Sequence, residues 1–105
     1  MVGERRAVSV ILPVELDIDR VREVQAQLLQ ALETPAISLD GTPVQRADTA
    51  GVQLLCALVI AAQRRGVALT WSAVSPALVT CVQLLGAGSV VRLDGVRQEG
   101  LEWFE

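Results

Sequence analysis

The chain has 105 residues, of which 51% are hydrophobic and 20% charged, and its 12 acidic and 9 basic side chains give a net charge of −3. This length accommodates one hydrophobic core, so we expect a single domain over residues 1–105, and the apolar composition excludes a disordered chain. Two Trp and one Phe, with no long basic run, argue against a nucleic-acid surface. The chain contains no His and no Tyr, which removes the commonest general base and metal ligand.

The cysteines and the apolar runs indicate the compartment. Cys56 and Cys81 are isolated in predicted helices, and we interpret both as buried small hydrophobes with free thiols, as in a reducing cytoplasm. The apolar run over residues 7–14 contains Pro13 and leads into acidic residues without a cleavage site. The longest uninterrupted apolar run, residues 54–62, is far shorter than the ~20 residues that span a bilayer. We therefore expect a cytoplasmic protein without direct membrane insertion.

The first half of the chain predicts strands around one amphipathic helix. Residues 7–12 are rich in β-branched side chains and predict a strand that Pro13 interrupts, with residues 14–16 as a short second piece. Apolar residues at helical spacing predict a helix over residues 20–33, capped by Asp17 or Asp19 and ended by Thr34 and Pro35. Residues 36–40 predict the next strand, and residues 44–47 connect it to the following helix.

The second half repeats this alternation. We expect a helix over residues 50–65 that stops at Gly66, and a strand over residues 67–71. Ser75 as N-cap and Pro76 at the first helical position predict a helix to residue 85, and residues 89–93 predict a last strand. The order is typical of an α/β domain with a small, mostly parallel sheet packed by three to four helices. The tail to residue 105 receives no assignment.

The helix over residues 50–65 is unusual because both of its sides are apolar. One stripe predicts the face toward the sheet, and it comprises Val52, Leu55, Leu58, Val59 and Ala62. The opposite side carries Ala50, Gln53, Ala57, Ile60, Ala61 and Arg64, with Leu54 and Cys56 at its edges. A smooth apolar face of this kind favours docking of a protein partner. The alternative is that the tail or self-association buries it, and a homodimer is compatible with the sequence.

At the start of that helix, Asp48 and Thr49 offer one carboxylate and one hydroxyl. Either oxygen can cap the helix by accepting from a free backbone N–H. Alternatively, Thr49 is a phosphorylation site, because the helix N-terminus favours an anion and the added charge would oppose docking on the apolar face. A third hypothesis is that the helix N-terminus binds a small anionic ligand or a nucleotide.

The remaining motifs exclude most enzymatic chemistry. Gly86 and Gly88 predict a helix terminus and not a dinucleotide loop, and no Walker-type sequence is present. The acidic residues are scattered and predict no metal cluster. We expect no enzyme activity, no cofactor and no metal site.

Several motifs occur in an order that resembles STAS domains, the fold of bacterial anti-sigma-factor antagonists and of cytoplasmic parts of sulfate transporters. Leu39-Asp40 followed by residues 47–55 is similar to the family's strand and D-S/T-x-G-L motif. Residues 66–69, 75–78 and 84–86 also fall where the family has equivalents, so the similarity spans roughly residues 8–93.

The resemblance implies a protein-binding module. In antagonists of this family the residue after the motif Asp is phosphorylated by an anti-sigma kinase, and this role falls on Thr49. Ala50 departs from the usual Asp-Ser-Ser/Thr-Gly pattern. The D-T-A-G form is also similar to the STAS subunit of Mla-type phospholipid-transport ABC complexes, which docks on an ATPase, and to STAS proteins of chemotaxis clusters. The expected partner-binding residues are Asp48, Thr49, Ala50, Gly51, Gln53, Leu54, Ala57 and Ser75.

Overall fold

In the computed structural model, residues 7–93 and 96 are described, and they form an alternating series of strands and helices. The strands are β1 (Val8–Ile11), β2 (Glu15–Leu16), β3 (Ala36–Gly41), β4 (Arg46–Ala47) and β5 (Ala68–Val74). The helices are α1 (Val21–Ala31), α2 (Thr49–Arg65), α3 (Pro76–Leu84) and α4 (Gly88–Val91).

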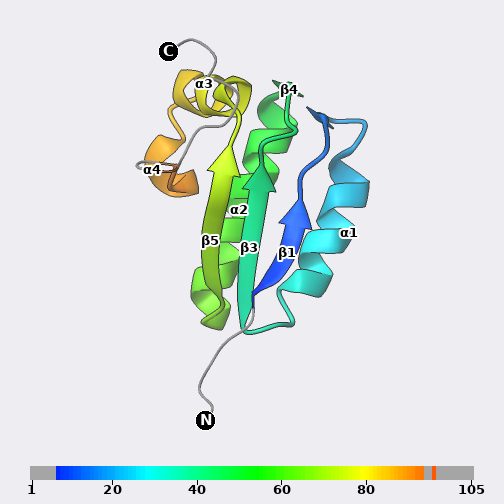
Figure 1. Cartoon of the computed structure of the whole chain (residues 1–105), viewed down its shortest axis with the longest axis vertical. Coiled ribbons are helices and arrows are strands. Elements are labelled where there is room, and N and C mark those ends of the chain that lie inside the picture. The colour runs from blue at the N-terminus through cyan, green and yellow to red at the C-terminus, as the bar shows by residue number, and fades with distance from the viewer. Residues whose placement is uncertain (1–6, 94–95, 97–105) are drawn as a thin grey trace.

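The main sheet has the order β1-β3-β5 and is parallel throughout (Figure 1). Val10 of β1 lies opposite Leu39 of β3, and Leu39 lies opposite Trp71 of β5. The register then shifts, because Ser72 is the extra residue of a β-bulge in β5. β2 and β4 form a separate two-stranded parallel pair. The predicted α/β class with a mostly parallel sheet is confirmed.

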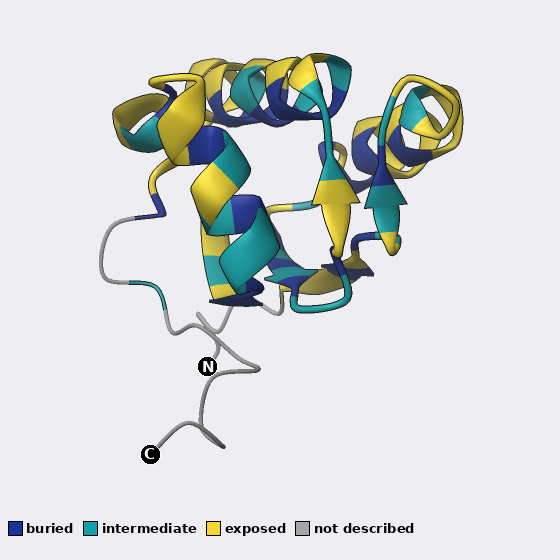
Figure 2. Cartoon of the chain, turned by 90° about the horizontal axis from the view of Figure 1, so that it is seen from above, coloured by how far each residue is buried: buried dark blue, intermediate teal, exposed yellow. Residues whose placement is uncertain are grey.

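α1 and α2 lie on one side of the main sheet, as the view from above shows (Figure 2). Parallel strands joined by right-handed crossovers place successive helices on the same side. α1 contributes Val24, Leu28 and Ala31 to the buried core. The stripe of α2 predicted to face the sheet is buried over its whole length. Ile37 and Leu39 of β3 are completely buried in the same core, so the central strand is the centre of the fold.

Two helix boundaries follow the sequence signals. α2 ends at Gly66, which has a left-handed φ of 69° that glycine adopts without steric cost. α3 begins with Ser75 as N-cap, whose side chain accepts a hydrogen bond from the backbone N–H of Leu78, and with Pro76 at its first position. Both predictions are confirmed.

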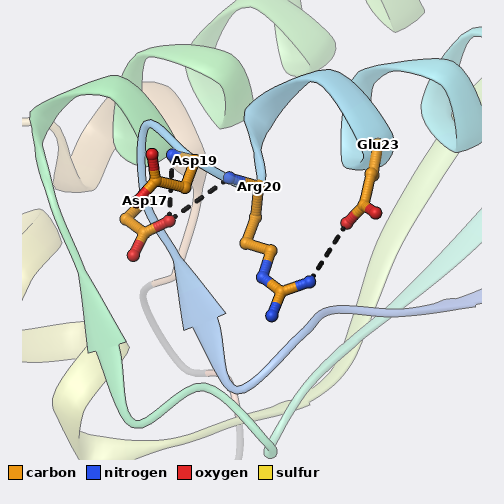
Figure 3. Close-up of polar contacts among 4 residues, drawn as sticks. All are labelled: Asp17, Asp19, Arg20 and Glu23. Atoms are coloured by element: carbon orange, nitrogen blue, oxygen red, sulfur yellow. Dashed lines mark hydrogen bonds and ion pairs between the residues drawn. The ribbon is translucent and has the colours of Figure 1, made fainter.

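The prediction that Asp17 or Asp19 is the N-cap of α1 is wrong. The N-cap residue is Arg20, which makes no side-chain capping bond. Oδ1 of Asp17 instead accepts from the backbone N–H groups of Asp19 and Arg20, at 3.1 and 3.3 Å, and closes the turn before the helix (Figure 3). The Arg20–Glu23 ion pair beside it, at 3.4 Å, is largely exposed and contributes little to stability.

The predicted last strand is also wrong, because Gly88–Val91 forms the short helix α4. Val90 and Val91 suggest a strand by their β-branching, but Val91 is fully buried while Val90 is exposed on the helix surface. The carbonyl oxygen of Val91 accepts a hydrogen bond from Nε1 of Trp71 at 3.1 Å, and the left-handed Arg92 ends the helix. Tertiary packing therefore overrides strand propensity at this point.

Two strands differ from the prediction in extent. β5 continues to Val74, three residues past the predicted end at Trp71. The predicted connection over residues 44–47 contains β4, which pairs with the short strand predicted over residues 14–16. A two-residue strand carries too few side chains to show an alternating pattern in the sequence. The tail beyond Leu93 lies outside the described residues, apart from Val96.

Candidate partner-docking site

Asp48 is the residue that fixes the start of α2. Its Oδ1 accepts from the backbone N–H of Gly51 at 3.0 Å, and its Oδ2 accepts from the backbone N–H of Ile18 at 3.1 Å. The carboxylate thus caps α2 and also holds the β2–α1 loop against it. Of the two capping candidates in the sequence, the structure selects Asp48. Because both oxygens are occupied, this carboxylate supports the site more than it offers a contact.

Thr49 is the first residue of α2 and is exposed. Its hydroxyl makes no hydrogen bond to any described residue, and the backbone N–H groups of Thr49 and Ala50 have no acceptor within this part of the chain. The first turn of α2 therefore presents a free hydroxyl next to two free N–H groups. This geometry leaves the Thr49 oxygen accessible to a modifying enzyme or a partner.

Gly51 is buried because α2 begins in direct contact with β2. A Cβ atom at Gly51 would lie 2.2 Å from the backbone oxygen of Leu16 and 2.8 Å from its Cγ. Leu16 is itself completely buried, and its backbone oxygen accepts from the N–H of Asp48 at 3.2 Å. The motif glycine is thus required for close packing. Because Gly51 is buried, it is not available for the partner contact that the sequence predicted.

The outward face of α2 is apolar and only partly open. Gln53, Ala57 and Ile60 are exposed, whereas Ala50, Leu54, Cys56 and Ala61 are half-buried. α1 runs beside this face and forms a groove of about 130 Å³ with it. The groove is lined by Gln25, Leu28, Leu29, Leu32, Leu54, Ala57, Leu58 and Ala61. The predicted apolar face therefore continues across the groove onto exposed Leu29 of α1.

Ser75 does not lie on this surface, although it was predicted as a contact residue. It is 5% exposed, and its Oγ accepts from the backbone N–H of Leu78 at 3.1 Å. Its role as N-cap of α3 is sufficient to explain a serine at this position. The contribution of α3 to the site is instead indirect.

α3 contributes to the site through a hydrogen bond made by Cys81. Its Sγ donates to the backbone oxygen of Ala47 at 3.3 Å, which holds α3 next to the strand that leads into Asp48. Burial raises the pKa of the Cys81 thiol, and the neighbouring negative charge of Asp48 raises it further. The thiol is thereby kept protonated, which suits a donor and not a nucleophile.

Ile18 is the site residue that the sequence did not indicate. It is 67% exposed, and its backbone N–H is bound by the Asp48 carboxylate at the start of α2. Its apolar side chain is thus exposed in the loop that Asp48 holds against the start of α2. The available signal was an isoleucine between two aspartates, where a loop would ordinarily be polar throughout.

The described residues contain no group of three or more His, Cys, Asp or Glu side chains placed to hold a metal ion. In the same part of the chain, no helix is both long and apolar enough to cross a membrane. Among the residues described, the site brings together the exposed Thr49 hydroxyl, two helix N–H groups without an acceptor there, and an apolar surface.

Comparisons with known proteins place these features in a family. The family model described as "Mlab, STAS domain" matches residues 3–95. The structure is similar to that of the unphosphorylated form of SpoIIAA, an anti-sigma factor antagonist, with a TM-score of 0.60 and 21% sequence identity. The match covers 99% of this chain and 89% of the SpoIIAA chain. A comparison with curated proteins finds no match.

Proposed function

Because the chain belongs to the STAS domain family, we propose that it is a non-enzymatic, cytoplasmic regulatory module that binds a protein partner. The proposed surface comprises Thr49, Ile18 and the outward face of α2. The observation that carries the proposal is the exposed hydroxyl of Thr49, which bonds to no residue that the structure describes, at the rim of an apolar helix face. The free thiols Cys56 and Cys81 are compatible with a reducing compartment.

The proposal includes a switch at Thr49. Because Asp48 caps α2, phosphorylation of Thr49 would not remove the cap. The phosphate would lie at a helix N-terminus, which favours an anion, and would add up to about two negative charges at the edge of the apolar surface. A partner docked on that surface would have to desolvate this charge. Phosphorylation is therefore expected to release the partner.

Affinity purification from the native host, followed by binding measurements with the purified partner, tests the proposal. Thr49→Glu is expected to weaken partner binding at least tenfold. Thr70→Glu is the matched control, because Thr70 is exposed on β5 and its side chain points away from the helices. Phosphate is expected on Thr49 after incubation with a kinase encoded nearby. Equal binding by both variants would refute the switch.

A second candidate function is a constitutive subunit of a phospholipid-transport ABC complex. The name of the matching family model favours it, as does Ala50, which replaces the second hydroxyl of the antagonist motif. This function requires stable copurification with an ATPase and no phosphate on Thr49. Ala57→Asp is expected to disrupt the complex, because Ala57 is exposed on the docking face of α2.

The matched control for that variant is Ala26→Asp, since Ala26 is also exposed on a helix but does not line the α1–α2 groove. Leu54→Asp is a weaker choice, because Leu54 is half-buried in the groove and its substitution would also destabilise the fold. An ATPase complex that tolerates Ala57→Asp as well as Ala26→Asp would contradict docking on this face.

A further inference from the structure

The groove between α1 and α2 adjoins a second hollow toward the end of α2. This hollow has a volume of about 530 Å³ and is lined by Ala57, Ile60, Ala61, Arg64 and Arg65. Ala57 and Ala61 line the groove as well, so the two hollows form one continuous surface. The apolar surface therefore ends at two arginines in the last turn of α2. At 1.5 Å per residue, they lie roughly 24 Å along the helix from Thr49.

Arg64 and Arg65 place positive charge at one end of an apolar surface, in a chain whose net charge is −3. Both are exposed, and the ion pairs among the described residues involve other arginines. Glu33, which follows α1, lines a different hollow and forms no ion pair with either of them. Their position in the last turn complements the helix dipole, but leaves both guanidinium groups available to a partner.

The walls of the groove indicate the shape of what binds there. They are two helices, whose interior backbone groups are hydrogen-bonded within each helix, so they offer apolar side chains and few main-chain donors or acceptors. An extended segment lying on them would leave its own N–H and C=O groups unpaired, whereas a helix satisfies these groups internally. The groove volume of about 130 Å³ is below the ~300–1,000 Å³ of small-molecule pockets. The groove therefore suits the side chains of a docked helix.

We infer that this surface binds an amphipathic helix of a partner protein, with apolar side chains in the groove and acidic side chains against Arg64 and Arg65. The inference rests on the proposed function and names the part of the partner that α2 recognises. Guanidinium groups bind carboxylates through two parallel hydrogen bonds. The negative charges of Asp48 and of exposed Asp19 at the opposite end of α2 repel such a partner segment there. Because acidic residues favour the first turn of a helix, the partner helix runs antiparallel to α2.

A second copy of this chain does not offer a helix of this kind within the residues that the structure describes. Only α1 has an acidic residue in its first turn, and this residue, Glu23, is paired with Arg20. The apolar stripe of α1 is buried in its own core and comprises Val24, Leu28 and Ala31. The occupant is therefore a different protein.

Two designed peptides of roughly 15 residues, stapled as helices, match the length of α2 and probe the surface. Both carry leucines at spacings of three and four residues, and the first turn contains two glutamates in one peptide and two lysines in the other. Fluorescence anisotropy with the full chain measures their Kd values. The glutamate peptide is expected to bind in the micromolar range, about tenfold more tightly than the lysine peptide. NMR shift changes are expected at Leu29, Ala57 and Ala61, which line the groove.

Charge reversal at the end of α2 tests the role of the arginines. Arg64→Glu combined with Arg65→Glu is expected to reverse the preference, so that the lysine peptide binds more tightly. The matched control is Arg92→Glu, since Arg92 is exposed at the end of α4 and lines neither hollow. It is expected to bind both peptides like the unmodified chain, and circular dichroism establishes that the variants are folded.

Equal affinity of the two peptides for the unmodified chain overturns the inference, as does absence of binding at ~1 mM or an unchanged preference in the charge-reversed chain. Shift changes confined to other surfaces also overturn it. A chain of twice 11.2 kDa that Leu29→Asp returns to the monomer mass would show that a second copy fills the groove, with the same consequence. The switch is judged separately, by the binding of Thr49→Glu to the partner purified from the host, so either proposal can fail without the other.

Discussion

The contact between Gly51 and Leu16 gives a sharp prediction about the start of α2. In Gly51→Ala the new Cβ would lie 2.2 Å from the backbone oxygen of Leu16, so the two elements must separate. They are also joined by the hydrogen bond from the N–H of Asp48 to this same oxygen, at 3.2 Å. The Asp48 carboxylate in turn accepts from Gly51 N–H at 3.0 Å. Movement of the first turn therefore strains both bonds.

The free energy of unfolding is expected to fall by about 2 kcal/mol. Overpacking against a fixed backbone costs ~1–3 kcal/mol, and weakening of the Asp48 cap costs ~1 kcal/mol. The gain from replacing a helical glycine by alanine offsets only ~0.5–1 kcal/mol. For a domain of this size, such a loss lowers Tm by roughly 8–16 °C.

Urea unfolding and thermal melts followed by circular dichroism measure this change. Gly88→Ala is the matched control, because Gly88 begins α4 and nothing lies within 4 Å of a Cβ built there. Its stability is expected to stay unchanged or to rise by up to ~1 kcal/mol. If Gly51→Ala melts at the temperature of Gly88→Ala, the close approach of α2 to β2 is not what requires glycine at this position.

Three further predictions concern the residues around this turn. Asp48→Ala removes the acceptor for two backbone N–H groups, and is expected to lower the free energy of unfolding by ~1–2 kcal/mol in urea titrations; an unchanged midpoint would contradict its capping role. Ser75→Ala is expected to cost ~1 kcal/mol while leaving partner affinity unchanged, because the hydroxyl caps α3 from a buried position; a loss of affinity without a loss of stability would restore it as a contact. In a Cys56→Ser background, alkylation of Cys81 is expected to be slower than that of the urea-unfolded chain at the same pH, because its pKa is raised and less thiolate is present. Equal rates in the two states would refute the raised pKa.

The sequence predicted those features that depend on local signals. The strand–helix alternation, the buried stripe of α2, the Gly66 stop and the Ser75-Pro76 start of α3 each rest on residues close together in the chain. The ordered motifs also indicated the STAS family, which the family match over residues 3–95 confirms. The strand predicted from the β-branched Val90 and Val91 was wrong, because burial of Val91 and its hydrogen bond from Trp71 favour a helix there.

Only the tertiary structure could decide how the residues near Thr49 divide their roles. Asp48 and Thr49 are equal candidates for the cap in the sequence, and the choice depends on Ile18, 30 positions away, which binds the second oxygen of Asp48. Gly51 became a packing residue because Leu16 lies against it, and Ser75 proved to be buried. Local spacing determines which residues form a helix, whereas long-range contacts determine which side chains remain free to bind.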